Sequence, residues 1–473
     1  MNARTASRGG RARAVAYAAV LCAVFFLGGE AAVRGLQARG YLAESRNLNA
    51  LFPVRSWQDL FDDPTLLNTR YGARDAAVLM RVQHATRTLV IDPTGENMRA
   101  QRVPLDAPPG QLRILFLGGS SVYGFIYPRG ETSFPAFVED RLASRWGEGR
   151  VRCVNGGIGA GTSARCLQIL GIAGPALHPG IVVVYSGHND GYPLCVVSLP
   201  DLHPDRKMSW VVAAYRRSAL LRLGAVFFRH GTKARLQREE KMIAAFEARE
   251  KVLDEPTARG LRRLRVLVDE NYRSNLERIV RAARKDGARV LLLSVTSNLL
   301  FGEEGPRVHR PDFPRARLAD FEAGMAEVDA LYRGQRFEEM IPKAERLLAI
   351  DDSYVHLRFL LGKALAACGR TDEALVHLRA ARDLPLAYTT TGPRAPTSRA
   401  AIVEEVAEQE GAAFLNVEET LLRRPDYWTQ CESWFADNLH LSVRGQQLMA
   451  DLIVGELERL GWVPGPGRAA EHR

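Results

Sequence analysis

Two hydrophobic patterns alternate along most of the chain beyond residue 110. Short runs of apolar and β-branched residues are typical of strands that are buried on both faces, and longer amphipathic stretches between them are typical of helices. The predicted strands are residues 113–117, 151–154, 181–185, 290–294 and 414–417, and the predicted helices include 134–146 and 272–285. This alternation favours an α/β fold with a parallel sheet.

Two segments interrupt the alternation. Residues 200–270 are mixed in charge and helix-prone, which fits a lid, a membrane-facing amphipathic element or a plain helical excursion. Residues 318–386 carry small and apolar residues spaced as in tetratricopeptide repeats, which are helical hairpins. Two such repeats are fewer than the roughly three that a free solenoid needs, so we expect them to pack on the α/β domain. The residues that carry this spacing are Leu361, Gly362, Leu365, Gly369, Ala374, Leu378 and Ala381.

The N-terminus has the pattern of an export signal. Four arginines lie within residues 4–13, and residues 14–29 are uncharged. A basic start before an apolar run predicts that the positive end stays in the cytoplasm and that the rest of the chain is exported. The run is slightly shorter than the roughly 20 residues of a full span. An uncleaved single-pass anchor in the cell membrane is the favoured interpretation, and a cleaved signal peptide is the alternative.

A chain of 473 residues is expected to contain two or three structural units. The predicted order is a signal anchor, a membrane-proximal stalk with short strands, the first part of the α/β domain, the repeat-like helical insertion, and the second part of the α/β domain. The corresponding ranges are 1–31, 32–110, 111–317, 318–386 and 387–465.

Charge and cysteine content exclude some functions. The net charge of +10 comes from arginines that are spread along the chain. Basic residues do not form a stripe interleaved with aromatics, which disfavours nucleic-acid binding. The six cysteines show no CxxC or Cys/His ligand spacing, so we predict neither a metal nor a cofactor. An exported domain permits a disulfide. A Cys195–Cys431 bridge and separate buried thiols are both compatible with the sequence.

Polar residues follow the predicted strands at the places where ligands bind in open α/β sheets. Ser120 comes after the first strand and two glycines, a glycine-rich segment at 155–161 follows the second, and Asn189 follows the third. Asp437 and His440 lie three residues apart near the C-terminus. The carboxyl ends of parallel strands meet at one edge of a sheet, so we expect the first three segments to converge there.

These residue types suit acyl transfer. A serine nucleophile needs a histidine base, and the imidazole needs a third group to orient it. Asp437 and His440 supply the orienting group and the base for Ser120, while Ser121 is the rival nucleophile. The Asn189 amide and glycine-rich backbone offer N–H donors for a tetrahedral oxyanion.

With these motifs the chain resembles the SGNH hydrolase superfamily, also called GDSL esterases, over residues 113–299 and 397–460. Residues 118–120 match its nucleophile turn, 187–190 its Gly-x-Asn-Asp block, and 437–440 its Asp-x-x-His block. The resemblance implies a flavodoxin-like three-layer sandwich. It also implies an oxyanion hole formed by the backbone N–H groups of Ser120 and Ala160 and the side chain of Asn189.

Two positions depart from the family pattern. Gly119 stands where the family has aspartate, which leaves the nucleophile intact. Ala160 stands where the family has an oxyanion glycine, and its backbone N–H remains available if the backbone adopts a conformation that alanine tolerates.

The sequence therefore predicts an exported serine esterase with envelope glycans or lipids as substrates. Two alternatives remain open at this stage. The same triad serves an O-acyltransferase, in which a sugar hydroxyl replaces water. A scaffold with an inactive hydrolase fold, whose helical repeats bind a protein partner, is the second.

Overall fold

The centre of the molecule is a five-stranded parallel sheet with the strand order β5-β4-β6-β7-β8. The computed structural model describes residues 24–32, 80–92, 101–124, 132–159, 161–191, 252–253, 255–301, 307–384 and 394–463. The strands are β4 (Leu112–Gly118), β5 (Val151–Gly157), β6 (Ile181–Tyr185), β7 (Arg289–Leu293) and β8 (Ala413–Leu415).

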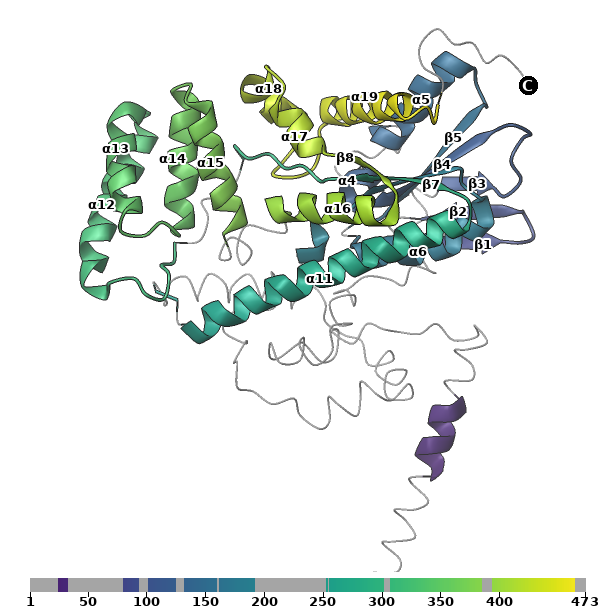
Figure 1. The fold of residues 1–473 in the computed structure, drawn as a ribbon, viewed down its shortest axis with the longest axis horizontal. Helices are drawn as coiled ribbons and strands as arrows, with labels where there is room; N and C mark the ends of the chain where they lie inside the picture. Colours follow the sequence, from purple (N-terminus) through teal and green to yellow (C-terminus); the bar gives the residue numbers. More distant parts are fainter. Residues whose placement is uncertain are drawn as a thin grey trace, which may run out of the picture.

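Helices cover both faces of this sheet (Figure 1). One face packs against α6 (Ser163–Leu177), α11 (Glu255–Lys285) and α16 (Thr397–Glu410). The other packs against α5 (Phe134–Trp146) and α19 (Val443–Arg459). The prediction of an α/β fold, a flavodoxin-like three-layer sandwich with a parallel sheet, is confirmed. The same strand order places the switch point between β4 and β6, where ligands bind in such folds.

The strands form where continuous apolar runs predict them, with small shifts at their ends. The clearest correction concerns residues 414–417, because the strand ends at Leu415 and Val417 begins α17 (Val417–Leu422). The side chain of Asn416 accepts a hydrogen bond from the N–H of Glu419 and so caps that helix. Next comes α18 (Tyr427–Trp434), which packs on the same face as α19.

The short strands expected before residue 110 form a separate antiparallel sheet in the order β1-β2-β3. Their bounds are Met80–Gln83, Thr88–Ile91 and Gln101–Pro104. Met80, Leu89 and Val103 are buried in the same apolar cluster as α6 and α11. This small sheet therefore extends the α6 side of the sandwich. The helical stalk predicted ahead of it lies outside the described residues.

Four helices between β7 and α16 form a body with its own core, which lies to one side of the sheet (Figure 1). They are α12 (Leu318–Arg333), α13 (Phe337–Leu348), α14 (Val355–Ala367) and α15 (Thr371–Asp383), preceded by the short helix η6 (Arg315–Arg317). Gly362 faces Leu378, and a Cβ on Gly362 would lie only 2.6 Å from Leu378 Cγ. The small residue thus allows α14 and α15 to pack closely, as the repeat-like spacing predicts. The assignment of these helices to tetratricopeptide repeats stays a prediction.

Several predictions fall partly or wholly on residues that the structure does not describe. Of the N-terminal segment, residues 24–32 are described and helical. No helix within the described ranges is both long and apolar enough to span a membrane. Most of the segment at 200–270 and Cys195 also lie outside these ranges, and Cys431 carries a free, buried thiol.

Candidate active site

The turn after β4 is glycine-rich because its surroundings leave no room for side chains. A Cβ on Gly118 would lie 2.3 Å from the Tyr185 carbonyl oxygen, and one on Gly119 would lie 2.6 Å from Asn189 Nδ2. Ser120 then begins the short helix α4 (Ser120–Tyr123). The glycine at position 119 therefore has a local reason, since any side chain there would displace Asn189.

Ser120, His440 and Asp437 form a continuous hydrogen-bonded chain. The Nε2 atom of His440 lies 2.8 Å from Ser120 Oγ, and its Nδ1 atom lies 2.6 Å from Asp437 Oδ2. With Nδ1–H donated to the carboxylate, Nε2 is left as the acceptor for the serine hydroxyl. The imidazole is thus oriented as a general base for Ser120.

Asp437 is held ionised by its own loop. Burial opposes ionisation, but hydrogen bonds from the His440 ring and from the backbone N–H groups of His440 and Leu439 outweigh it and lower the pKa of Asp437. The two N–H groups lie 2.7 and 2.9 Å from Asp437 Oδ1. The loop is fastened to the segment that follows β7 by a hydrogen bond of 3.0 Å from the N–H of Asn298 to the Asn438 carbonyl.

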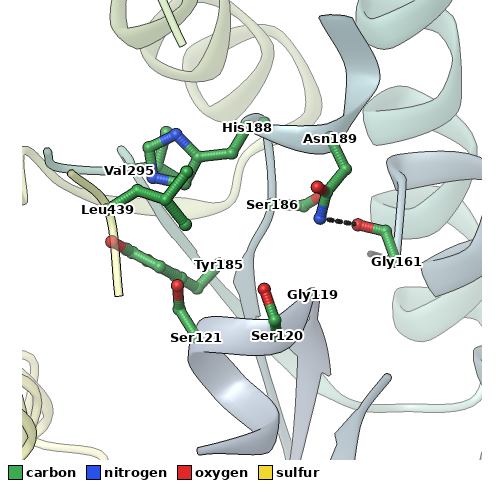
Figure 2. Close-up of a pocket in the computed structure, with 11 residues that line it drawn as sticks. Gly119, Ser120, Ser121, Gly161, Tyr185, Ser186, His188, Asn189, Val295 and Leu439 are labelled. Carbon is green, nitrogen blue, oxygen red and sulfur yellow. Dashed lines mark hydrogen bonds between the residues drawn. The ribbon is translucent and has the colours of Figure 1, made fainter. Parts of the chain in front are cut away.

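Asn189 lies at the start of the short helix η4 (Asn189–Gly191), after β6. Its Nδ2 atom donates to the Gly161 carbonyl at 3.0 Å, and Figure 2 shows both residues around the pocket that contains Ser120. This bond uses one of the two amide hydrogens. It turns the nitrogen, rather than the oxygen, toward the turns at Gly119 and Gly161. The second hydrogen remains for an oxyanion. Ala160 lies outside the described residues, so its N–H stays a predicted donor.

Ser121 also lines the pocket, but its place differs from that of Ser120. The His440 Nε2 contact is to Ser120 Oγ. The carbonyl of Ser121 accepts a hydrogen bond of 3.2 Å from Gln446 Nε2, which ties α4 to α19. The geometry therefore favours Ser120 over Ser121 as the nucleophile.

His188 is a pocket residue that the sequence reasoning missed. Its Nε2 atom lies 3.1 Å from the Thr296 carbonyl, and its Nδ1 atom accepts from the N–H of Ala395 at 3.1 Å. Burial lowers the pKa of His188 to about 3. Both nitrogens are engaged and the ring is neutral, so His188 holds three loops together rather than acting as a base. In the sequence, its position within the Gly-x-Asn-Asp block at residues 187–190 could have indicated that it lies at the site.

No protein-family model matches the sequence, and no curated protein matches it. Among solved structures, a lipase/acylhydrolase from Enterococcus faecalis is similar at 14% identity and a TM-score of 0.33, covering 76% of this chain and all of its own. An alpha/beta hydrolase enzyme from the metagenome of Lake Arreo is similar at 13% identity and a TM-score of 0.34, with 76% of this chain and 99% of that chain covered. A catalytic mutant of an acetylxylan esterase from Geobacillus stearothermophilus is similar at 13% identity and a TM-score of 0.31, with 74% of this chain and 95% of that chain covered. Since similarity at this level is too low to carry a function, the function has to come from the site residues themselves.

Proposed function

We propose that the protein is a serine hydrolase of the SGNH type that cleaves carboxylic esters. The observation that supports this most directly is the chain from Ser120 Oγ through His440 to Asp437, with contacts of 2.8 and 2.6 Å. The 2.8 Å contact lies within the distance at which a base takes a proton from a nucleophile, and the 2.6 Å contact orients that base. Asn189 adds an amide donor beside the same serine, at the switch point of the sheet.

The reaction proceeds in two acyl-transfer steps. Ser120 Oγ attacks the ester carbonyl while His440 Nε2 takes its proton, and the imidazolium is stabilised by Asp437. The oxyanion receives hydrogen bonds from the Asn189 amide and from the N–H groups of Ser120 and Ala160. His440 then gives the proton to the leaving alcohol. A water molecule, activated by the same imidazole, releases the acid and restores Ser120.

The location and substrates proposed for this activity follow from the sequence pattern. The basic start and the apolar run at 14–29 support a single-pass anchor with the catalytic domain on the extracytoplasmic side of the cell membrane. Acylated envelope glycans or lipids are then the esters within reach. The helical hairpins α12 to α15 are a proposed docking element for a protein partner.

The direct test compares the full-length chain, purified in detergent, with its Ser120→Ala variant on a panel of p-nitrophenyl esters. We expect the native chain to hydrolyse at least one ester, and the variant to lose all but a residual activity, since removal of a triad member typically costs about 10⁴-fold or more. A fluorophosphonate should label Ser120 in the native chain only. Folded native protein that neither hydrolyses any ester nor reacts with the probe would refute the proposal.

A further inference from the structure

The mechanism above leaves one buried carboxylate beside the site unexplained. Asp190 directly follows Asn189 and is only 6% exposed. Its two oxygens lie 3.0 and 3.2 Å from the backbone N–H of Ser163, and the Ser163 hydroxyl donates to one of them. The Ser186 hydroxyl lies 3.4 Å from the other oxygen. A carboxylate of the β6 loop is thus bound to the first residue of α6.

Further hydrogen bonds fix this contact from the α11 side. Asn275, which is 2% exposed, donates its Nδ2 to Ser163 Oγ at 3.0 Å. The hydroxyl of Tyr272 donates to the Ser186 carbonyl at 2.6 Å. Ser163 and Ser186 are therefore each held by a further hydrogen bond besides their contacts with Asp190.

The same two loops are joined a second time at the oxyanion donor. Asn189 donates to the Gly161 carbonyl at 3.0 Å, and Asp190 binds Ser163 two residues further on. The Gly161 turn has little room to adjust, because its N–H bonds the Ile158 carbonyl at 2.8 Å and a Cβ on Gly161 would lie 2.8 Å from the Gly118 oxygen. The consecutive residues Asn189 and Asp190 thus bind Gly161 and Ser163, which lie two residues apart at the start of α6.

We propose that Asp190 is a positioning residue for the oxyanion hole. Through Ser163 it fixes the position of Gly161, whose carbonyl orients the Asn189 amide. Asp190 touches neither substrate nor nucleophile and acts through Asn189 and Gly161. The inference rests on the proposed esterase function.

The test is a double-mutant cycle on the full-length chain with the best p-nitrophenyl ester. Asp190→Asn keeps the side-chain volume but replaces one acceptor oxygen with a donor that faces Ser163. We expect kcat to fall roughly 10- to 100-fold with KM changed less than threefold, since small displacements of catalytic groups have effects of this size. In the Asn189→Ala background, Asp190→Asn should cause little further loss, because the amide that it positions is already gone.

Asp351→Asn is the matched control. Asp351 is a fully buried aspartate in the helical body, where it binds His309 at 2.8 Å and Ser353. Its variant should lose thermal stability and keep its kcat. If Asp190→Asn does not fold, Ser163→Ala removes the hydroxyl partner alone and enters the same cycle.

The outcomes separate the two proposals. A native chain without Ser120-dependent ester hydrolysis overturns the proposed function and this inference together. If the native chain is active and Asp190→Asn keeps the native kcat, this inference is overturned and the esterase function stands. The same holds if the fold-losses in kcat of Asn189→Ala and Asp190→Asn multiply fully in the double variant.

Discussion

At the scale of single residues, the site depends on the placement of one amide. Asn189 Nδ2 is fixed by the Gly161 carbonyl at 3.0 Å before any substrate arrives. A preorganised donor of this kind stabilises charge that develops only in the transition state, so it acts on kcat more than on KM.

We therefore expect Asn189→Ala to lower kcat by about 10²–10³-fold while KM stays within a few-fold of the native value. Steady-state hydrolysis of the best p-nitrophenyl ester measures both constants. Fluorophosphonate labelling of Ser120 shows that the variant is folded and that the Ser120–His440 contact survives. Unchanged turnover would remove Asn189 from the mechanism.

His188 gives a second residue-level prediction, on stability against pH. The pKa of its ring is about 3 in the folded chain, mainly through burial, with the nearby charge of Arg399 also lowering it. The unfolded value is near 6.5, so between the two the unfolded state binds a proton that the folded state lacks. The free energy of unfolding should fall as pH drops below about 6.5, with a contribution from His188 of about 1.4 kcal/mol per pH unit.

Urea unfolding between pH 6 and pH 4.5 measures this contribution. His188→Gln should flatten the dependence on pH by that amount, although it destabilises the chain at pH 7 through the lost contacts with Thr296 and Ala395. His84→Gln, at an exposed histidine, is the control for the substitution itself. Equal slopes for the native chain and His188→Gln would show that the ring titrates normally.

At the scale of elements, the sequence predicts the helices and strands whose formation depends on the local pattern of apolar and polar residues. The strands β4, β6 and β7 are largely apolar runs because the centre of the parallel sheet is buried on both faces. The edge strand β5 also contains the polar residues Arg152 and Asn155. The helix α5 matches its predicted bounds. The helix α11 begins at Glu255 rather than at the predicted residue 272, and its first half places Ala258 and Val268 in the core of the helical body.

The residues of the candidate site divide in the same way, into those that lie in local motifs and those defined by contacts between distant segments. Ser120, Asn189, Asp437 and His440 could be predicted as candidates because each lies in a short motif next to a predicted element, and the structure brings them together. The contacts of His188 and Asp190 could not be predicted, because their partners Thr296, Ala395 and Ser163 are distant in the sequence. Contacts of that kind appear only when the elements are packed.

The turn between β4 and α4 carries a prediction at this scale. Gly119→Ala places a Cβ only 2.6 Å from Asn189 Nδ2, so the amide has to move. Displacement of a catalytic group by about 1 Å costs up to roughly 10²-fold, and we expect kcat to fall at least tenfold while Ser120 remains in place.

Gly171→Ala in α6 is the matched control, because a Cβ there meets no atom within 4 Å. It should keep native kcat and gain slightly in stability from the better helix propensity of alanine. Ester hydrolysis and thermal melting of both variants measure the two effects. Native turnover in Gly119→Ala would mean that Asn189 shifts without consequence, and the steric reason for this glycine would fail.

At the scale of the whole molecule, one buried ionic cluster joins the helical body to the α/β domain. Arg382, at the end of α15 and 3% exposed, donates to Glu418 of α17 at 2.5 Å and to Thr397 of α16 at 2.7 Å. Burial alone would lower the pKa of Arg382, but Glu418 and Asp383 raise it above its usual value. The body is therefore fastened to the domain that contains Asp437 and His440.

Removal of the positive charge of Arg382 should destabilise the helical body and the α/β domain together. Arg382→Met leaves Glu418 buried without this partner, which typically costs about 3–5 kcal/mol, whereas Arg382→Met with Glu418→Gln removes both charges and should recover part of that loss. Urea unfolding is followed by circular dichroism and by loss of ester hydrolysis. We expect the two transitions to shift equally, because a body that leans on the α/β domain unfolds with it. If activity persists after the helical signal has shifted, the body is an independent unit and its contact with the domain does not support the site.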